Sequence, residues 1–249
     1  IFLGHGSPMN AIEDNAHTRE WRRLGASIPR PEAILCVSAH WFIRGTKVTG
    51  EAQPKQFYDM YGFPEELYRL VYPVPGSPEL ANRVPELLPA KVEADSSWGI
   101  DHGAWSVLTH LFPTADIPVV QLSLDRNAPP ELHYRLGAAL KPLRNEGILI
   151  LGSGNVVHNL AMVNWHMRGG FDWADRFDEQ IRDKIVERDF EVVTGYRSWN
   201  KDASLAVPTP DHYLPLLYVL GASDPQDQLR VINADRVLGS LSMTGYIFG

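Results

Sequence analysis

The chain has 249 residues, 44% hydrophobic and 21% charged, which is ordinary for a soluble globular protein. Its formal net charge of −7 argues against a nucleic-acid-binding protein, which would carry a basic face. The single cysteine excludes an internal disulfide and a cysteine-rich zinc site, so we expect Cys36 to be a buried structural thiol.

Apolar runs and amphipathic stretches alternate along the chain, as in proteins with a largely parallel or mixed β-sheet. The predicted strands are residues 1–4, 33–38, 46–49, 91–94, 118–124, 147–151, 229–232 and 240–248, the last of them near a sheet edge. The predicted helices are residues 16–28, 77–89, 104–112, 129–143, 171–188 and 211–220.

No internal repeat, low-complexity segment or domain boundary interrupts this pattern. We therefore expect residues 1–249 to form one α/β domain with a central sheet flanked by helices. Residues 51–76 are rich in Tyr, Phe, Pro and Gly and predict a long structured loop. Loops of that length are usually functional.

Three histidines stand at the ends of predicted buried strands: His5, His40 and His158. In an open α/β sheet the ligand site lies outside the carboxyl ends of the strands, where such residues converge. Imidazole is the commonest metal ligand and the acid/base group of neutral pH. These positions therefore predict a metal site with catalytic groups beside it.

Each of the three also has a structural interpretation. His5 could be a turn residue packed under Pro8, and His40 a core residue bonded to a backbone carbonyl. We favour metal ligation for His5 because it stands at a strand end, and for His40 because we expect its strand to be adjacent to that of His5. His158 follows a glycine-serine-glycine turn that lacks the lysine and spacing of a nucleotide site. We interpret it as an acid/base residue, with a structural histidine as the alternative.

Two further histidines stand at predicted helix starts. His102 follows Asp101, a candidate N-cap, and the positive helix terminus would keep its imidazole neutral and suited to accept a proton. A plain capping role is the alternative. His212 follows a stiff Pro-Thr-Pro-Asp segment in which Asp211 is the expected N-cap and the nearest carboxylate. We prefer His212 to Asp211 as a site residue. The other histidines, which we expect at the surface or in packing, are His17, His110, His133 and His166.

Five motifs in one order along the chain carry a resemblance to a known family. They are Gly4–Met9, Ser38–Trp41, Trp98–Gly103, Gly152–Asn159 and Pro208–Tyr213. Together they resemble the 4,5-DOPA extradiol dioxygenases, a branch of the LigB-type class III ring-cleavage enzymes. The resemblance implies a LigB-like single α/β catalytic domain over residues 1–249.

The same resemblance implies one divalent metal held by His5, His40 and His212, with His158 and His102 as catalytic groups in the substrate pocket. Fe(II) is expected for activity. Zn(II) is plausible as the bound ion, because three histidines with an open position are also a catalytic zinc pattern. The implied reaction is extradiol cleavage of a DOPA-like catechol by O2 to a muconic semialdehyde of the 4,5-seco-DOPA type.

We expect His158 to be the base that removes a catechol proton. The aromatic segment 57–63, Tyr213 and Tyr218 are candidates for a lid or a ring-stacking wall, with core packing as the alternative. The partners expected are a catechol and O2, with no nucleic acid or membrane. We expect a cytoplasmic monomer.

Two rival functions use the same residues. A zinc hydrolase or lyase would use the histidines to activate water. A non-enzymatic metal-binding module of the Memo type would have the same fold, but with cysteine expected where this chain has His212. Nucleotide binding through Gly152–Gly154 is the weakest interpretation.

Overall fold

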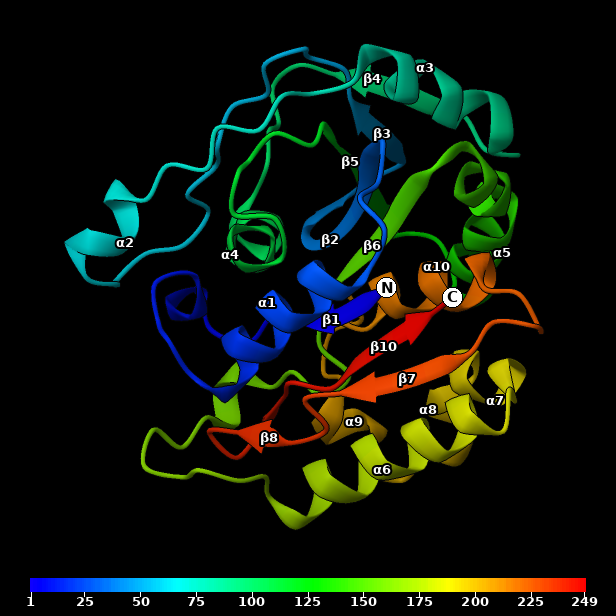
Figure 1. Ribbon diagram of the computed structural model, residues 1–249. Helices are drawn as coiled ribbons and strands as arrows, with labels where there is room; N and C mark the ends of the chain where they lie inside the picture. The colour runs from blue at the N-terminus through cyan, green and yellow to red at the C-terminus, as the bar shows by residue number, and fades with distance from the viewer.

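Eight strands form the central sheet of the computed structural model, which describes residues 1–249 (Figure 1). Their bounds are β1 Phe2–Gly4, β2 Ala33–Ile43, β3 Thr46–Thr49, β4 Val92–Asp95, β5 Val119–Asp125, β6 Ile148–Gly154, β7 Leu229–Ile232 and β10 Gly245–Phe248. The strand order is β4-β3-β5-β2-β6-β1-β10-β7. A separate pair consists of β8 Arg236–Val237 and β9 Leu241–Ser242.

The centre of the sheet is parallel and its flanks are antiparallel. Strands β5, β2, β6 and β1 run in one direction, whereas β3 is antiparallel to β5 and β10 is antiparallel to both β1 and β7. The prediction of a mixed, mostly parallel sheet flanked by helices is confirmed. The carboxyl ends of the four central strands consequently share one edge, where a ligand site is expected.

Helices cover both faces of the sheet (Figure 1). Their bounds are α1 Ala16–Ser27, α2 Glu65–Arg69, α3 Pro78–Leu87, α4 His102–Leu111, α5 Pro130–Leu140, α6 Asp172–Val186, α7 Phe190–Thr194, α8 Tyr196–Trp199, α9 Ala203–Ala206 and α10 Leu214–Ala222. Short 3-10 helices span Pro8–Ala11, Lys141–Glu146 and Leu160–Met162. No helix combines the length and the apolar character that crossing a bilayer requires.

The strand β2 contributes side chains to the hydrophobic core on both faces of the sheet. Its side chains alternate between the two faces of the sheet. Ile34 and Cys36 pack in the core cluster that contains α1 and α4, whereas Leu35 and Val37 pack in the one that contains α5 and α10. Cys36 is fully buried, as expected, and burial raises the pKa of its thiol well above the usual value.

The structure differs from the sequence prediction at the end of the chain and in three short helices. The predicted last strand is divided into β9 and β10, and β10 lies next to the edge strand β7, as expected of a strand near the sheet edge. At this division the side chains of Ser242 and Thr244 donate hydrogen bonds to the buried carboxylate of Asp178. The helices α7, α8 and α9 have four or five residues each, too few for a helical period to show in the sequence.

Candidate active site

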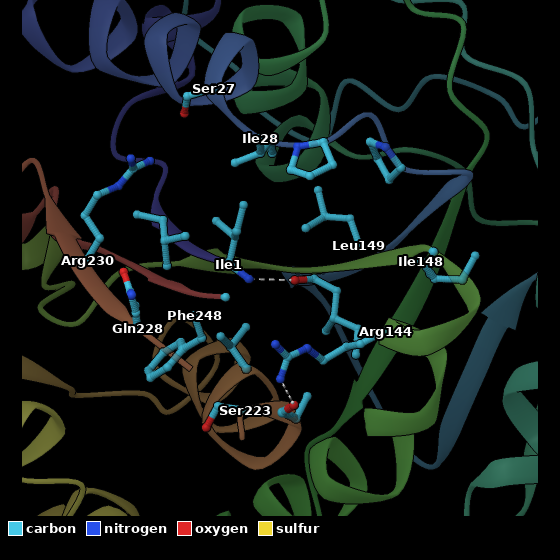
Figure 2. Close-up of a pocket in the computed structure, with 18 of the residues that line it drawn as sticks. Ile1, Ser27, Ile28, Arg144, Ile148, Leu149, Ser223, Gln228, Arg230 and Phe248 are labelled. Carbon is cyan, nitrogen blue, oxygen red and sulfur yellow. Dashed lines mark hydrogen bonds between the residues drawn. The ribbon is translucent and has the colours of Figure 1, made fainter. Parts of the chain in front are cut away.

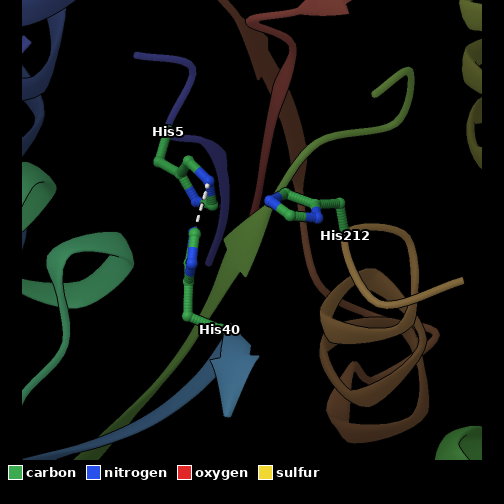
Figure 3. A group of neighbouring side chains, drawn as sticks. All are labelled: His5, His40 and His212. Carbon is green, nitrogen blue, oxygen red and sulfur yellow. Dashed lines mark hydrogen bonds between the residues drawn. The ribbon is translucent and has the colours of Figure 1, made fainter. Parts of the chain in front are cut away.

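Three histidines from distant parts of the chain meet at the carboxyl edge of the sheet (Figure 3). His5 follows β1 directly, His40 lies in β2, and His212 precedes α10. One ring nitrogen of each lies within 4.8 Å of the others. The Nε2 atoms of His5 and His40 are 3.3 Å apart. The structure thus brings together the three histidines for which the sequence predicts metal ligation.

The path of β6 explains how they meet. The expectation that β1 and β2 are adjacent is wrong, because β6 lies between them. Only small residues stand at the end of β6, and Ser153 Oγ lies 2.9 Å from His5 Nδ1. A Cβ atom at Gly154 would lie 2.2 Å from the carbonyl oxygen of His212, so glycine is needed for the two segments to cross. Gly152–Gly154 is therefore part of a strand and not the turn that the sequence predicts.

His40 also differs from its predicted place at the end of a strand. The strand β2 continues to Ile43, and His40 lies within it. The pairing of β2 with β5 changes register between Val37 and Phe42. This irregularity is the local feature that sets His40 at the sheet edge, since such a shift redirects side chains.

The Nδ1 atom of each of the three rings faces an oxygen. Ser153 Oγ donates its own proton to the Gly103 carbonyl at 2.5 Å and must therefore accept from His5 Nδ1. The Asp59 carboxylate lies 3.1 Å from His40 Nδ1, and the Asp211 carboxylate accepts from His212 Nδ1. An oxygen that accepts at Nδ1 places a ring proton there and leaves Nε2 as the atom of each ring that can bind a metal.

The Nε2 atoms of the three rings point into one space, where those of His5 and His40 make a contact that one proton or a metal cation must bridge. His212 Nε2 is buried and has no hydrogen-bond partner. A buried polar atom without a partner requires an explanation, and two ring nitrogens 3.3 Å apart need a proton or a metal cation between them. The oxygen that orients each imidazole is the usual support of a metal-ligating histidine. The donor set therefore fits a divalent metal ion.

Burial controls the charge of two of these rings. It lowers the pKa of His5 and of His212 well below the usual value, and the surrounding imidazoles lower both pKa values further. Burial also acts to lower the pKa of His40, but the hydrogen bond to Asp59 and the nearby carboxylates outweigh it and raise that pKa. Neutral His5 and His212 are the forms that bind metals.

His102 and His158 stand beside this trio. His102 begins α4, and Asp101 caps that helix through Ala104 N–H, as predicted. The His102 ring lies 3.8 Å from that of His40, and the His158 ring stacks on that of His212, with centroids 3.4 Å apart and planes inclined by 4°. Burial, with smaller effects of neighbouring imidazoles, lowers the pKa of His158 to about 4, against the opposing charge of Asp211.

The whole chain, residues 1–249, matches the family model described as the catalytic LigB subunit of aromatic ring-opening dioxygenase. The chain belongs to the LigB family. It is 48% identical to the 4,5-DOPA dioxygenase extradiol of Escherichia coli, over 100% of this chain and 94% of that protein. It is 37% identical to the Beta vulgaris protein of the same name, over 100% and 95% of the two chains.

A solved structure supports the same assignment. The crystal structure of an uncharacterized protein from Escherichia coli K12 superimposes with a TM-score of 0.85 at 46% identity, over 98% of this chain and 97% of that one. The LigB family consists of metal-dependent aromatic ring-opening dioxygenases, so this chain is an enzyme of that class. Membership also favours ring opening over the hydrolase and the non-enzymatic module.

Two acidic residues of this LigB enzyme have places that the sequence analysis did not predict. Asp59, which was not singled out, contacts His40 and His102; the only available signal was a lone charge inside an aromatic loop. Asp211 is not a helix N-cap, because α10 begins three residues later and its carboxylate binds His212 instead.

Most of the aromatic side chains proposed as a lid are structural. Tyr213 and Tyr218 are fully buried, and Tyr213 donates to the Val193 carbonyl at 2.9 Å, so neither lines a lid. In the segment 57–63, Tyr61 is 93% exposed and the other side chains are half-buried. The remaining histidines lie outside the trio, in packing or at the surface as expected: His17, His110, His133 and His166.

A cavity of about 470 Å³ lies at the opposite edge of the sheet (Figure 2). It is lined by the amino ends of the central strands, including Ile1 and Ile148. Its lining has no histidine, aspartate, glutamate or cysteine. The guanidinium of Arg144 is bound to Asp227 and to the Ala222 carbonyl. This cavity offers no group for acid/base or metal chemistry.

Proposed function

We propose that this LigB enzyme catalyses the metal-dependent extradiol cleavage of a DOPA-like catechol by O2, giving a muconic semialdehyde. The convergence of three Nε2 atoms, with two further histidines beside them, is the observation that carries this proposal. The names of the Escherichia coli and Beta vulgaris relatives support DOPA as the first substrate to test.

His5, His40 and His212 would hold the metal, with their Nδ1 atoms fixed by Ser153 and by two carboxylates. Three protein ligands leave positions open for other molecules. We propose Fe(II) for the reaction, although Zn(II) would suit the same imidazoles. When bound, ferrous iron would supply the redox chemistry that lets triplet O2 react with a closed-shell aromatic ring.

His158 and His102 would move and hold protons. With a pKa of about 4, His158 is neutral at pH 7 and can accept a proton from a catechol hydroxyl. It can return that proton later in the reaction, when an oxygen needs one. Burial, with the neighbouring His40, also lowers the pKa of His102, despite the opposing effect of Asp59. A neutral His102 would hydrogen-bond and orient the substrate.

The whole of residues 1–249 would act as one catalytic domain, since the site draws residues from the loop that directly follows the first strand, at His5, and from the segment before α10. The test is anaerobic reconstitution with Fe(II) or Zn(II), followed by O2 uptake and visible spectroscopy with DOPA. Uptake with a yellow product in the iron enzyme alone would support the proposal. Tight metal binding without uptake across a panel of catechols would refute it.

A further inference from the structure

The carboxylate of Asp59 contacts two histidines from two different elements. Its Oδ2 lies 3.1 Å from His40 Nδ1 in β2. Its Oδ1 accepts the backbone N–H of His102, at the start of α4, at 2.8 Å and lies 2.9 Å from the Nδ1 atom of that ring. Asp59 itself belongs to neither element, because it lies in the loop between β3 and α2.

The backbone just before Asp59 is held by α4 and by the segment that leads into this helix. The Phe57 N–H donates to the Ile100 carbonyl at 2.8 Å, and Trp105 Nε1 donates to the Phe57 carbonyl at 2.8 Å. The Asp59 side chain is only 15% exposed. The two carboxylate oxygens therefore have fixed tasks, one toward α4 and the other toward His40.

We propose that Asp59 is a positioning residue that keeps the proton of His40 on Nδ1 and so directs the His40 Nε2 lone pair into the metal site. This inference rests on the proposed function, in which His40 is a metal ligand. An ionised carboxylate can only accept hydrogen bonds, so a ring that faces it must present N–H. Because the backbone of His102 occupies the other oxygen, the carboxylate cannot rotate away.

Asp211 provides a matched comparison. Its carboxylate faces His212 Nδ1 in the same way, but its other oxygen makes no hydrogen bond within the protein. An asparagine at position 211 could therefore rotate its carbonyl oxygen toward His212 and preserve the Nδ1–H form. An asparagine at position 59 has no such freedom.

In Asp59→Asn the backbone N–H of His102 holds the amide oxygen at the Oδ1 place, so the NH2 group faces His40. That donor pairs only with an unprotonated Nδ1, which moves the ring proton to Nε2 and removes the metal-binding lone pair. Asp59→Ala leaves space in which water can accept the Nδ1 proton. The inference therefore predicts an unusual order of metal affinities, in which the isosteric Asp59→Asn binds the metal more weakly than Asp59→Ala.

The experiment measures Zn(II) affinity by competition with a chromophoric chelator for wild type, Asp59→Asn, Asp59→Ala and Asp211→Asn. We expect Asp59→Asn to weaken affinity roughly 10–100-fold, the size usual for partners of metal-ligating histidines. Asp59→Ala and Asp211→Asn should lose less. Nitrogen NMR of the metal-free protein should find the His40 proton on Nδ1 in wild type and on Nε2 in Asp59→Asn, a shift that loss of packing would not cause.

Two other results would contradict either the role of Asp59 or the metal centre itself. Wild-type affinity in Asp59→Asn, or a greater loss in Asp59→Ala than in Asp59→Asn, would make Asp59 a loop anchor and overturn the inference. A wild-type protein that binds no Zn(II) would refute the metal centre itself, and the inference with it. Binding by wild type therefore separates failure of the inference from failure of the proposed function.

Discussion

The convergence of their ring nitrogens sets the three proposed ligands apart from the other two histidines of the site. The oxygen at Nδ1 does not do so alone, because His102 Nδ1 also lies 2.9 Å from Asp59 Oδ1. The rings of His5, His40 and His212 each have an oxygen at Nδ1 and an Nε2 directed at the others. His158 stacks flat on His212 and has no such oxygen fixing Nδ1. A ring that is held by stacking can exchange a proton without disturbing a metal ligand.

Replacing His158 with alanine should therefore slow turnover and spare the metal. We expect a loss in kcat of about 10²–10⁴-fold, the usual contribution of general acid–base catalysis. Zn(II) affinity should stay close to that of the wild type, and the exposed His166→Ala provides the control. An unchanged kcat would remove His158 from the mechanism, whereas loss of bound metal would make it a ligand.

At the scale of elements, β6 determines whether the site can form. Its last residues pass between β1 and β2, and Gly154 lies under the segment that carries His212. Larger side chains at the end of this strand would separate the histidines. The glycines of β6 are therefore part of the construction of the site, although they contribute no chemical group.

Gly154→Ala tests this role. Its Cβ would lie 2.2 Å from the His212 carbonyl oxygen, so the backbone before α10 must move. We expect the free energy of unfolding to fall by about 1–3 kcal/mol, as in other overpacked sites, together with weaker Zn(II) binding. Denaturant unfolding and chelator competition measure the two effects. The control is Gly169→Ala, where an added Cβ meets no atom within 4 Å; equal behaviour of the two variants would contradict the prediction.

The sequence predicts the parts of this site that depend on neighbouring residues, and it does not predict the contacts between elements that lie far apart in the chain. The positions of His5 after β1 and of His102 at the start of α4 follow from local patterns, because apolar runs mark strands wherever they pack. The predicted strand-end places of His40 and His158 are wrong, because β2 continues past His40 and β6 ends four residues before His158. Asp59 could not be predicted in this way, since its partners belong to two elements that only the fold brings together. The insertion of β6 between β1 and β2 is likewise a matter of strand order, which alternation along the chain does not encode.

At the scale of the whole molecule, buried histidines link stability to pH. Burial lowers the pKa of His158 and of His133 to about 4, below the value of about 6.5 in an unfolded chain. The unfolded state therefore binds more protons between these values, and stability falls as pH falls. Metal-free protein should lose unfolding free energy from about pH 6.5 toward pH 4. Denaturant titrations across this range measure the loss, and a flat profile would contradict the prediction.

Metal binding should oppose that loss, because the ligands join segments that lie far apart in the chain. His5 directly follows the first strand and His212 lies in the segment before α10, so an ion between them binds the folded state alone. At a Zn(II) concentration of 100 times Kd, we expect stabilisation of about 2.7 kcal/mol at neutral pH. The gain should shrink on acidification, since protons compete with the metal for the same lone pairs. Thermal unfolding with and without Zn(II), at several pH values, measures this coupling. In His212→Ala the gain should disappear, and stabilisation that persists there would show that the ion binds elsewhere on the protein.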